Sequence, residues 1–125
     1  VTGLNPHSGE DGEFGDEEIK IIKPVVSEMQ ELGISVNGPI PSDTAFTPKI
    51  MSKTDCYLAM YHDQGLAPFK ALTFGKGVNV TLGLPIIRTS VDHGTGLDIV
   101  GSNTIDPSSF FESIKLAISI AKNQY

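Results

Sequence analysis

The feature that most constrains this chain is a short apolar run, residues 56–60, that leads directly into a polar stretch, residues 61–70. The polar stretch places His62, Asp63, Gln64 and Lys70 within ten positions. The apolar run is typical of a strand buried on both faces, and an α/β protein presents its reactive groups where such a strand ends. The pattern therefore predicts a functional site at the end of a central strand.

The rest of the sequence alternates between expected strands and helices. Strands are predicted at residues 1–4, 34–40, 56–60 and 78–82, and helices at 16–33, 66–74 and after Asp106-Pro107, with a short helical turn within 46–52. Residues 5–15 and 88–96 are expected to be long polar loops. This order predicts an α/β fold. Pro24 should kink or split the first long helix, whereas Asp106 should cap the last one with Pro107 at its first position.

Two apolar faces are expected to pack into the core. They recur at helical spacing and consist of Ile19, Ile22, Val26 and Met29 in the first long helix, and of Phe110, Phe111, Ile114, Ala117, Ile118 and Ala121 in the last.

Length and charge narrow the classes of protein to consider. A chain of 125 residues is long enough for one domain with a substantial core. The net charge of −6, with no basic cluster, argues against a nucleic-acid partner. No apolar run is long enough to cross a membrane, and no signal-peptide pattern is present. The single cysteine, Cys56, is expected to be a buried strand residue, and its use indicates a reducing, cytoplasmic setting.

The start of the chain also carries information. Val1 opens the sequence without a methionine, inside an expected strand. We therefore expect the sequence to be a piece of a longer protein.

The three histidines are candidates for chemistry. His7, His62 and His93 lie in polar, glycine-flanked surroundings, and each has a nearby carboxylate: Glu10, Asp63 and Asp92, respectively. Histidine is the commonest metal ligand, and two imidazoles from this chain would need at least one further protein ligand. The alternative is that they are solvated loop histidines.

Two cations and an amide are candidates for substrate binding. Arg88 is the only arginine, and it follows an apolar pair that would anchor its base. A fixed guanidinium suits a carboxylate or phosphate, although a surface ion pair is an equal alternative. Lys70 adds a second cation, and Asn79 projects from an expected strand with both a donor and an acceptor. Together with a metal, these groups describe a pocket for a small, anionic, hydroxylated substrate.

Four segments, residues 4–10, 61–65, 77–85 and 88–95, strongly resemble the 4-hydroxythreonine-4-phosphate dehydrogenase family of pyridoxal phosphate biosynthesis. The resemblance runs the whole length of the chain and covers the C-terminal part of the family's longer chain. It implies that residues 1–125 form the C-terminal part of a dehydrogenase with an isocitrate/isopropylmalate-dehydrogenase-like α/β fold. It also implies a homodimer with its sites at the interface.

The resemblance further implies an activity and its cofactors. The family oxidises the 3-hydroxyl of 4-phosphooxy-L-threonine with NAD or NADP, and the resulting keto acid loses carbon dioxide. A divalent metal, often zinc, with magnesium or cobalt as alternatives, is held by three histidines. His7 and His62 match two of these histidines, and the third lies upstream of this sequence.

The same resemblance assigns further residues. Lys70, Asn79 and Arg88 match substrate-binding positions. Asp63 is expected to support catalysis as the carboxylate beside His62, apart from the resemblance. The segment 93–101 with Asp106 is similar to the wider superfamily's adenine-binding loop, although Gly96 and Leu97 replace an Ala-Pro pair and Asp106 replaces an asparagine. The residues expected to contact the dinucleotide are His93, Gly94, Thr95 and Asp106.

Two alternatives stay open. Relatives of this family act on other phosphorylated hydroxy acids, such as phosphoerythronate, and the motifs do not distinguish these substrates. The chain as given is alternatively an inactive, dimerising piece. For the isolated chain we expect no NAD reduction and only weak zinc affinity.

Overall fold

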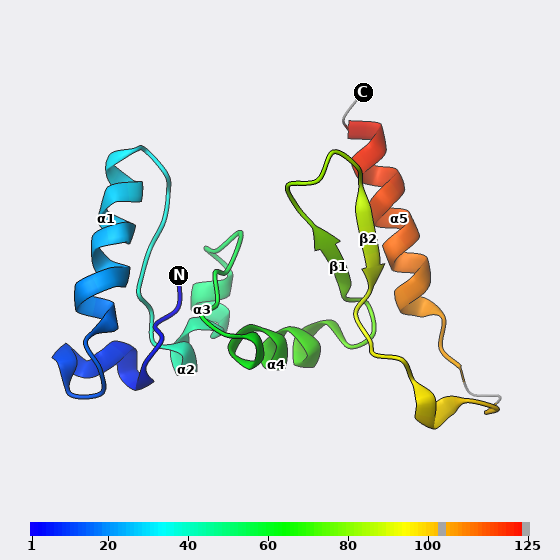
Figure 1. Ribbon diagram of the computed structural model, residues 1–125, viewed down its shortest axis with the longest axis horizontal. Coiled ribbons are helices and arrows are strands. Elements are labelled where there is room, and N and C mark those ends of the chain that lie inside the picture. Colours follow the sequence, from blue (N-terminus) through cyan, green and yellow to red (C-terminus); the bar gives the residue numbers. More distant parts are fainter. Residues whose placement is uncertain (103–104, 124–125) are drawn as a thin grey trace. The chain divides into compact units, whose positions relative to one another are not determined.

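The computed structural model describes residues 1–102 and 105–123. The chain forms two compact units that meet in sequence at Pro68, and each is described separately below. The first contains η1 (Pro6–Gly12), η2 (Glu18–Ile22), α1 (Lys23–Glu31), α2 (Ser42–Ala45), α3 (Pro48–Met51) and the start of α4 (His62–Thr73). The second contains the end of α4, then β1 (Val78–Thr81), β2 (Arg88–Val91), η3 (Leu97–Ile99) and α5 (Ser108–Asn123) (Figure 1).

Three extended segments of the first unit run side by side. The backbone N–H of Gly3 donates to the carbonyl of Ile40 at 2.8 Å, and the N–H of Thr2 donates to the carbonyl of Leu58 at 3.0 Å. Thr2 and Ile40 form one parallel bridge pair, outside any named strand. The strands predicted at 1–4, 34–40 and 56–60 are therefore extended segments held by a few hydrogen bonds, so the prediction of regular strands there is wrong.

The segment 56–60 differs most from its prediction. Leu58 is 60% exposed and Cys56 is exposed, so neither is the doubly buried strand residue expected. Within the part of the chain that the structure describes, backbone hydrogen bonds join this segment to residues 1–3 on one side only. An apolar run is buried on both faces only when both faces are covered.

The first long helix is divided, as Pro24 predicts. A π-helical turn, η2, runs directly into α1 with helical backbone angles at Ile22 and Lys23, and Pro24 lies just after this change of hydrogen-bond pattern. The helix stops at Gly33, whose φ of 83° suits glycine and whose N–H donates to the carbonyl of Gln30 at 2.9 Å. On its predicted apolar face, Ile22 and Val26 are buried. Ile19 is 44% exposed, so the prediction that it packs into the core is wrong.

A left-handed turn occupies most of η1. The φ angles of His7, Ser8, Gly9, Glu10 and Asp11 lie between 42° and 84°. Residues with a side chain rarely adopt this conformation, at a cost of roughly 1–2 kcal/mol each. Contacts from the rest of the first unit must therefore hold this turn in place.

Helix α4 begins earlier than predicted. It starts at His62 and contains Pro68, whereas the sequence suggested a start at residue 66 with the proline near it. The helix continues through Pro68, which removes the N–H that residue 68 would have donated and places its ring against the carbonyl of Gln64, four residues earlier. His62, Asp63 and Gln64 consequently lie in the first helical turn and not in a preceding loop.

The second unit is an antiparallel hairpin covered by a helix. Strands β1 and β2 pair with Asn79 opposite Ser90 and Thr81 opposite Arg88, so residues 88–91, predicted as loop, are a strand. Helix α5 lies along this hairpin (Figure 1). The hydroxyl of Thr89 donates to the carbonyl of Ser113 at 2.9 Å.

The packed face of α5 is not the one predicted. Ser109 and Ser113 are its buried residues, and their small side chains allow the helix to approach the strands closely. The hydroxyl of Ser109 also accepts from the N–H of Asp92 at 3.3 Å. Four of the apolar side chains predicted to pack lie outside this face and are 41–56% exposed: Phe110, Phe111, Ile114 and Ile118.

Polar groups outnumber apolar ones among the buried side chains. In residues 1–102 and 105–123, the buried hydrophobic residues are Ile22, Val26 and Ala45, whereas the buried polar residues are Thr2, Glu18, Gln64, Ser109 and Ser113. The expected substantial core is therefore wrong for the chain by itself. None of the described helices has the length and hydropathy needed to span a bilayer.

Candidate functional site

The two histidines expected to bind a metal both lie in the first unit. His7 belongs to the left-handed turn, and its ring stacks on Phe14 with centroids 6.0 Å apart. His62 is the first residue of α4. Both side chains are exposed, and neither imidazole has a hydrogen bond to the described parts of the chain. Their ring nitrogens are therefore available to a ligand.

Gln64 joins the two backbone segments that lead to these histidines. Its Nε2 donates to the carbonyl of Gly3 at 2.6 Å. Its Oε1 accepts from the hydroxyl of Thr2 at 2.6 Å and from the N–H of Met60 at 2.7 Å. The side chain is buried, with 6% of its area exposed. The structure thus ties the segment before His7 to the segment before His62.

Glu18 holds the entry to the left-handed turn from the other side. Its carboxylate is fully buried and accepts hydrogen bonds from the N–H of Leu4 at 2.7 Å and from the N–H of Asn5 at 2.8 Å. Burial by itself would raise the pKa of Glu18, but the hydrogen bonds from Asn5 and Leu4 outweigh it, so this pKa lies below its ordinary value. The carboxylate therefore stays charged at neutral pH.

Gly9 allows this close packing. Its φ is 84°, and a Cβ at this position would lie 2.9 Å from Oε2 of Glu18 and 2.8 Å from the carbonyl oxygen of Gly15. No side chain fits between these groups, so the turn that carries His7 closes directly against Glu18.

The first unit carries both of the histidines predicted to bind a metal. Two unencumbered imidazoles fit the donor chemistry of zinc. No group of three or more His, Cys, Asp or Glu side chains converges as a metal site within the described residues. A complete coordination sphere would need a ligand from outside them. Asp63 is exposed in the first turn of α4, and it has no hydrogen bond or ion pair within the same described parts.

Asn79 and Arg88 lie on one face of the hairpin in the second unit. Asn79 and Thr81 are two residues apart on β1, and Arg88 is opposite Thr81, so all three side chains share a face. Nη1 of Arg88 donates to the hydroxyl of Thr81 at 2.7 Å. Among the described residues Arg88 forms no ion pair, so the surface ion pair considered from the sequence is not seen. Its remaining N–H groups are available to an anion.

Lys70 lies beside His93 and Asp106 in the second unit. All three line a cavity of about 290 Å³, and Nζ of Lys70 donates to the carbonyl of Asp92 at 3.1 Å. A second cavity of about 760 Å³ is lined by all four residues expected to bind the dinucleotide: His93, Gly94, Thr95 and Asp106. The structure therefore gathers these four residues around one space.

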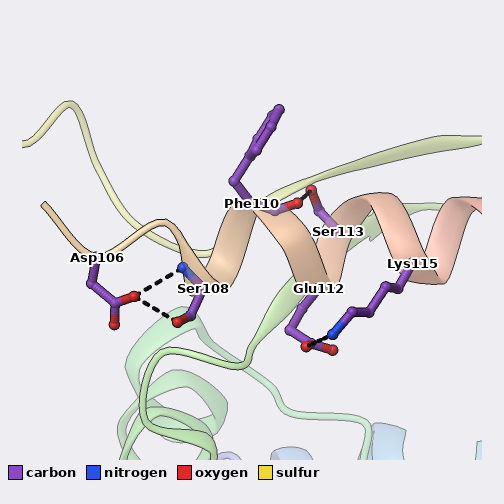
Figure 2. Close-up of polar contacts among 6 residues, drawn as sticks. All are labelled: Asp106, Ser108, Phe110, Glu112, Ser113 and Lys115. Carbon is purple, nitrogen blue, oxygen red and sulfur yellow. Dashed lines mark hydrogen bonds and ion pairs between the residues drawn. The ribbon is translucent and has the colours of Figure 1, made fainter.

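Asp106 also has the structural role predicted for it. Its Oδ1 accepts from the N–H of Ser108 at 2.9 Å and from the hydroxyl of Ser108 at 2.5 Å (Figure 2). This confirms the predicted cap of α5. The Ser108 hydroxyl and N–H hold the pKa of Asp106 below its ordinary value.

The sequence did not identify Glu18 or Gln64 as supports of the site. From the sequence, Glu18 is interpreted as a carboxylate at a helix start, where its charge interacts favourably with the helix dipole. Gln64 is only one of several polar residues in its segment. Their roles depend on distant partners: Leu4 and Asn5 lie 14 and 13 positions from Glu18, and Thr2 and Gly3 lie 62 and 61 positions from Gln64. The only local sequence feature that points to these roles is the glycine-rich stretch that forms the left-handed turn packed on Glu18.

Comparison with solved structures first gives a class of protein. The chain superposes on the crystal structure of 4-hydroxythreonine-4-phosphate dehydrogenase from Klebsiella pneumoniae with a TM-score of 0.81 and 51% identity, over 97% of this chain and 37% of that one. It also matches a terephthalate 1,2-cis-dihydrodiol dehydrogenase from Burkholderia xenovorans, with a TM-score of 0.65 and 35% identity, over 93% of this chain and 37% of that one. Both structures are named as dehydrogenases.

Sequence comparison then identifies the family. Residues 1–117 match the family described as pyridoxal phosphate biosynthetic protein PdxA, and the chain belongs to this family. It is 56% identical over 121 residues to 4-hydroxythreonine-4-phosphate dehydrogenase of Cupriavidus pinatubonensis, which covers 97% of this chain and 35% of that protein. The corresponding enzyme of Shewanella frigidimarina is 55% identical over 121 residues, covering 97% and 37%. The chain thus spans little more than a third of the length of these curated relatives.

Proposed function

We propose that this chain is part of a dehydrogenase that oxidises 4-phosphooxy-L-threonine with NAD or NADP to a 3-keto acid, which then loses carbon dioxide. The reaction belongs to pyridoxal phosphate biosynthesis. The observation that carries this proposal is the Gln64 bridge, the three hydrogen bonds by which this side chain joins the segments leading to His7 and His62. Within the described residues, neither imidazole forms a hydrogen bond. The identity of 56% to a relative named for this activity supports it.

His7 and His62 would hold a divalent metal, with zinc as the first choice and magnesium or cobalt as alternatives. A bound metal lowers the pKa of a coordinated hydroxyl and polarises the ketone formed from it. This chain would contribute both imidazoles on backbone segments that the Gln64 side chain holds together. Their ring nitrogens form no hydrogen bond within the described residues. The third ligand would come from outside the described residues.

Lys70, Asn79 and Arg88 would bind and orient the substrate. A guanidinium that is fixed on one side by Thr81 can offer its remaining N–H groups to a carboxylate or phosphate in a defined geometry. Asn79 offers an amide donor and acceptor on the same hairpin face. Orienting the substrate in this way selects the face that meets the nicotinamide.

The cavity lined by His93, Gly94, Thr95 and Asp106 would take part of the dinucleotide. Its volume of about 760 Å³ lies within the range of ordinary small-molecule pockets. We further propose the isocitrate/isopropylmalate-dehydrogenase-like fold, a homodimer and a cytoplasmic location for the whole protein. Asp63, exposed near His62, would support proton transfer.

A second candidate keeps the chemistry and changes the substrate. The Burkholderia xenovorans structure shares the fold and is named for a dihydrodiol. Another phosphorylated hydroxy acid, such as phosphoerythronate, would meet the same cations. The higher identity to the relatives named for 4-hydroxythreonine 4-phosphate favours the first candidate.

The test uses a chimera in which this chain replaces the matched segment of the Cupriavidus pinatubonensis relative. We expect NAD or NADP reduction with 4-phosphooxy-L-threonine, at a kcat/KM at least tenfold higher than with phosphoerythronate. His7→Ala and His62→Ala should each abolish turnover and metal binding. A chimera that prefers phosphoerythronate would favour the second candidate, and one that retains metal in both histidine variants would contradict the metal site. The isolated chain is expected to show no turnover.

A further inference from the structure

We propose that Gln64 is the positioning residue that sets the spacing between His7 and His62. The inference deepens the proposed function and rests on it, because it concerns the metal site that these two histidines would form. Gln64 would not touch the metal, and it would act through the backbone on both sides.

The contacts of Gln64 explain why a glutamine suits this role. The bridge needs one group that donates to the Gly3 carbonyl and accepts from two donors, the Thr2 hydroxyl and the Met60 N–H. A primary amide provides both functions on one side chain. Each of the three distances is between 2.6 and 2.7 Å, and the side chain is 6% exposed. Solvent therefore offers little replacement for any lost bond.

On the α4 side, Gln64 and His62 share one helical turn. Residues two positions apart in a helix differ by about 200° in direction, so one of their side chains points inward when the other points outward. Gln64 is buried and His62 is exposed, as this geometry requires. Anchoring Gln64 from the inside therefore fixes the direction in which His62 leaves the helix.

On the other side, no freely jointed segment separates the bridge from the left-handed turn. Gln64 holds the carbonyl of Gly3, and Glu18 then holds the N–H groups of Leu4 and Asn5. The N–H of Ser8 donates to the carbonyl of Asn5 at 3.1 Å, which closes the turn around His7. A displacement at Gln64 would therefore shift His7 as well as His62.

A role in stability alone predicts a different result from a positioning role. A purely structural Gln64 could be replaced at some cost in folding free energy, with metal affinity unchanged in the folded fraction. A positioning Gln64 controls the distance between two ligands, and support of this kind is typically worth 10- to 100-fold in metal affinity. Metal affinity and ligand geometry in folded protein therefore separate the two roles.

The experiment compares Gln64→Met and Gln64→Glu with a matched control, Val26→Ala, in the chimera defined above. Methionine keeps the volume and removes every hydrogen bond, whereas glutamate keeps the two acceptor contacts and loses the donor to Gly3. Val26 is buried in the same unit at 6% exposure and has no hydrogen-bonding side chain. Cobalt(II) titration gives the dissociation constant, and the visible absorption of bound cobalt reports its coordination geometry.

We expect Gln64→Met to weaken cobalt binding 10- to 100-fold with a changed spectrum. Gln64→Glu should weaken it as well, because a carboxylate oxygen would face the Gly3 carbonyl in place of the amide donor. Val26→Ala should lower the unfolding temperature while its affinity stays within twofold of the parent. Affinity and spectrum unchanged in folded Gln64→Met would overturn the positioning role. If Gln64→Met does not fold, parent-like cobalt binding by Gln64→Glu overturns it equally.

Failure of the proposed function has a separate signature. His7→Ala and His62→Ala should each remove cobalt binding from the chimera. Retention of binding in both would show that these histidines hold no metal, and the role assigned to Gln64 would then fall with the site. Loss of binding in both, with a parent-like Gln64→Met, would overturn the positioning role alone.

Discussion

Asn5 donates two hydrogen bonds to the buried carboxylate of Glu18, one from its backbone N–H at 2.8 Å and one from its Nδ2 at 2.9 Å. Leu4 adds a third from its N–H at 2.7 Å. Glu18 has no ion pair with the described residues, so N–H groups stabilise its charge. The loop that carries His7 is therefore folded around a carboxylate.

Replacing Glu18 by glutamine should destabilise the chain. The new amide nitrogen would face N–H donors, leaving at least one buried group unsatisfied, which costs about 1–3 kcal/mol. Urea denaturation followed by circular dichroism measures the loss of unfolding free energy. Glu13→Gln is the matched control, because it is the same chemical change at an exposed residue nearby. Equal stability of the two variants would contradict this role of Glu18.

The lowered pKa of Glu18 also predicts an acid sensitivity. Because the folded pKa lies below the unfolded value of 4.5, the ionised carboxylate stabilises the folded chain above pH 4.5. This contribution is lost as the pH falls from 4.5 through the folded pKa. The unfolding free energy of the parent should therefore fall more steeply below pH 4.5 than that of Glu18→Gln. Parallel pH profiles for the two proteins would argue against the shift.

The sequence predicted local features better than long-range ones. The Pro24 division, the Gly33 stop and the Asp106 cap were predicted correctly, because each depends on neighbours within a few residues. The start of α4 at His62 was missed, because Pro68 drew the predicted boundary toward itself. Strand 88–91 was missed because its residues are mostly polar, and its pairing with β1 decides its structure.

The predictions about burial failed for a related reason. An apolar pattern shows which face can be buried, but another element must be present to cover it. Leu58 and Phe110 are both more than half exposed in this chain. Conversely, the buried Gln64 gives no apolar signal, and its partner at Gly3 is 61 positions away. The quoted motifs located the candidate residues, whereas the supports for those residues became visible only in the structure.

Arg88 provides a test of the proposed substrate site. Arg88→Lys keeps the charge but loses the planar fork, so KM for the phosphorylated substrate should rise about tenfold in the chimera. Thr81→Val removes the hydroxyl that holds Nη1 and should raise KM by a smaller factor. Lys49→Ala, an exposed lysine on α3, is the control and should leave KM unchanged. An unchanged KM in Arg88→Lys would exclude bidentate recognition by this residue.

His93 provides a test that separates the cofactor from the metal. The residue lines two cavities of the second unit, those of about 290 and 760 Å³, and its Nδ1 lies 2.9 Å from the carbonyl oxygen of Gly94. His93→Ala should raise the dissociation constant for NAD severalfold, by fluorescence titration, and leave cobalt affinity unchanged. The assignment is wrong if cobalt affinity falls and the NAD dissociation constant stays the same.

The packing face of α5 can be tested by a pair of substitutions in this chain. Ser113 is 5% exposed between the helix and the hairpin, so Ser113→Leu should force the two apart and cost about 1–3 kcal/mol of unfolding free energy. Phe110 is 56% exposed and its ring points away from the helix (Figure 2), so Phe110→Ser should change stability far less. Thermal unfolding of both variants measures the contrast. A larger loss of unfolding free energy in Phe110→Ser than in Ser113→Leu would support the aromatic packing face predicted from the sequence, because only a buried ring contributes that much stability.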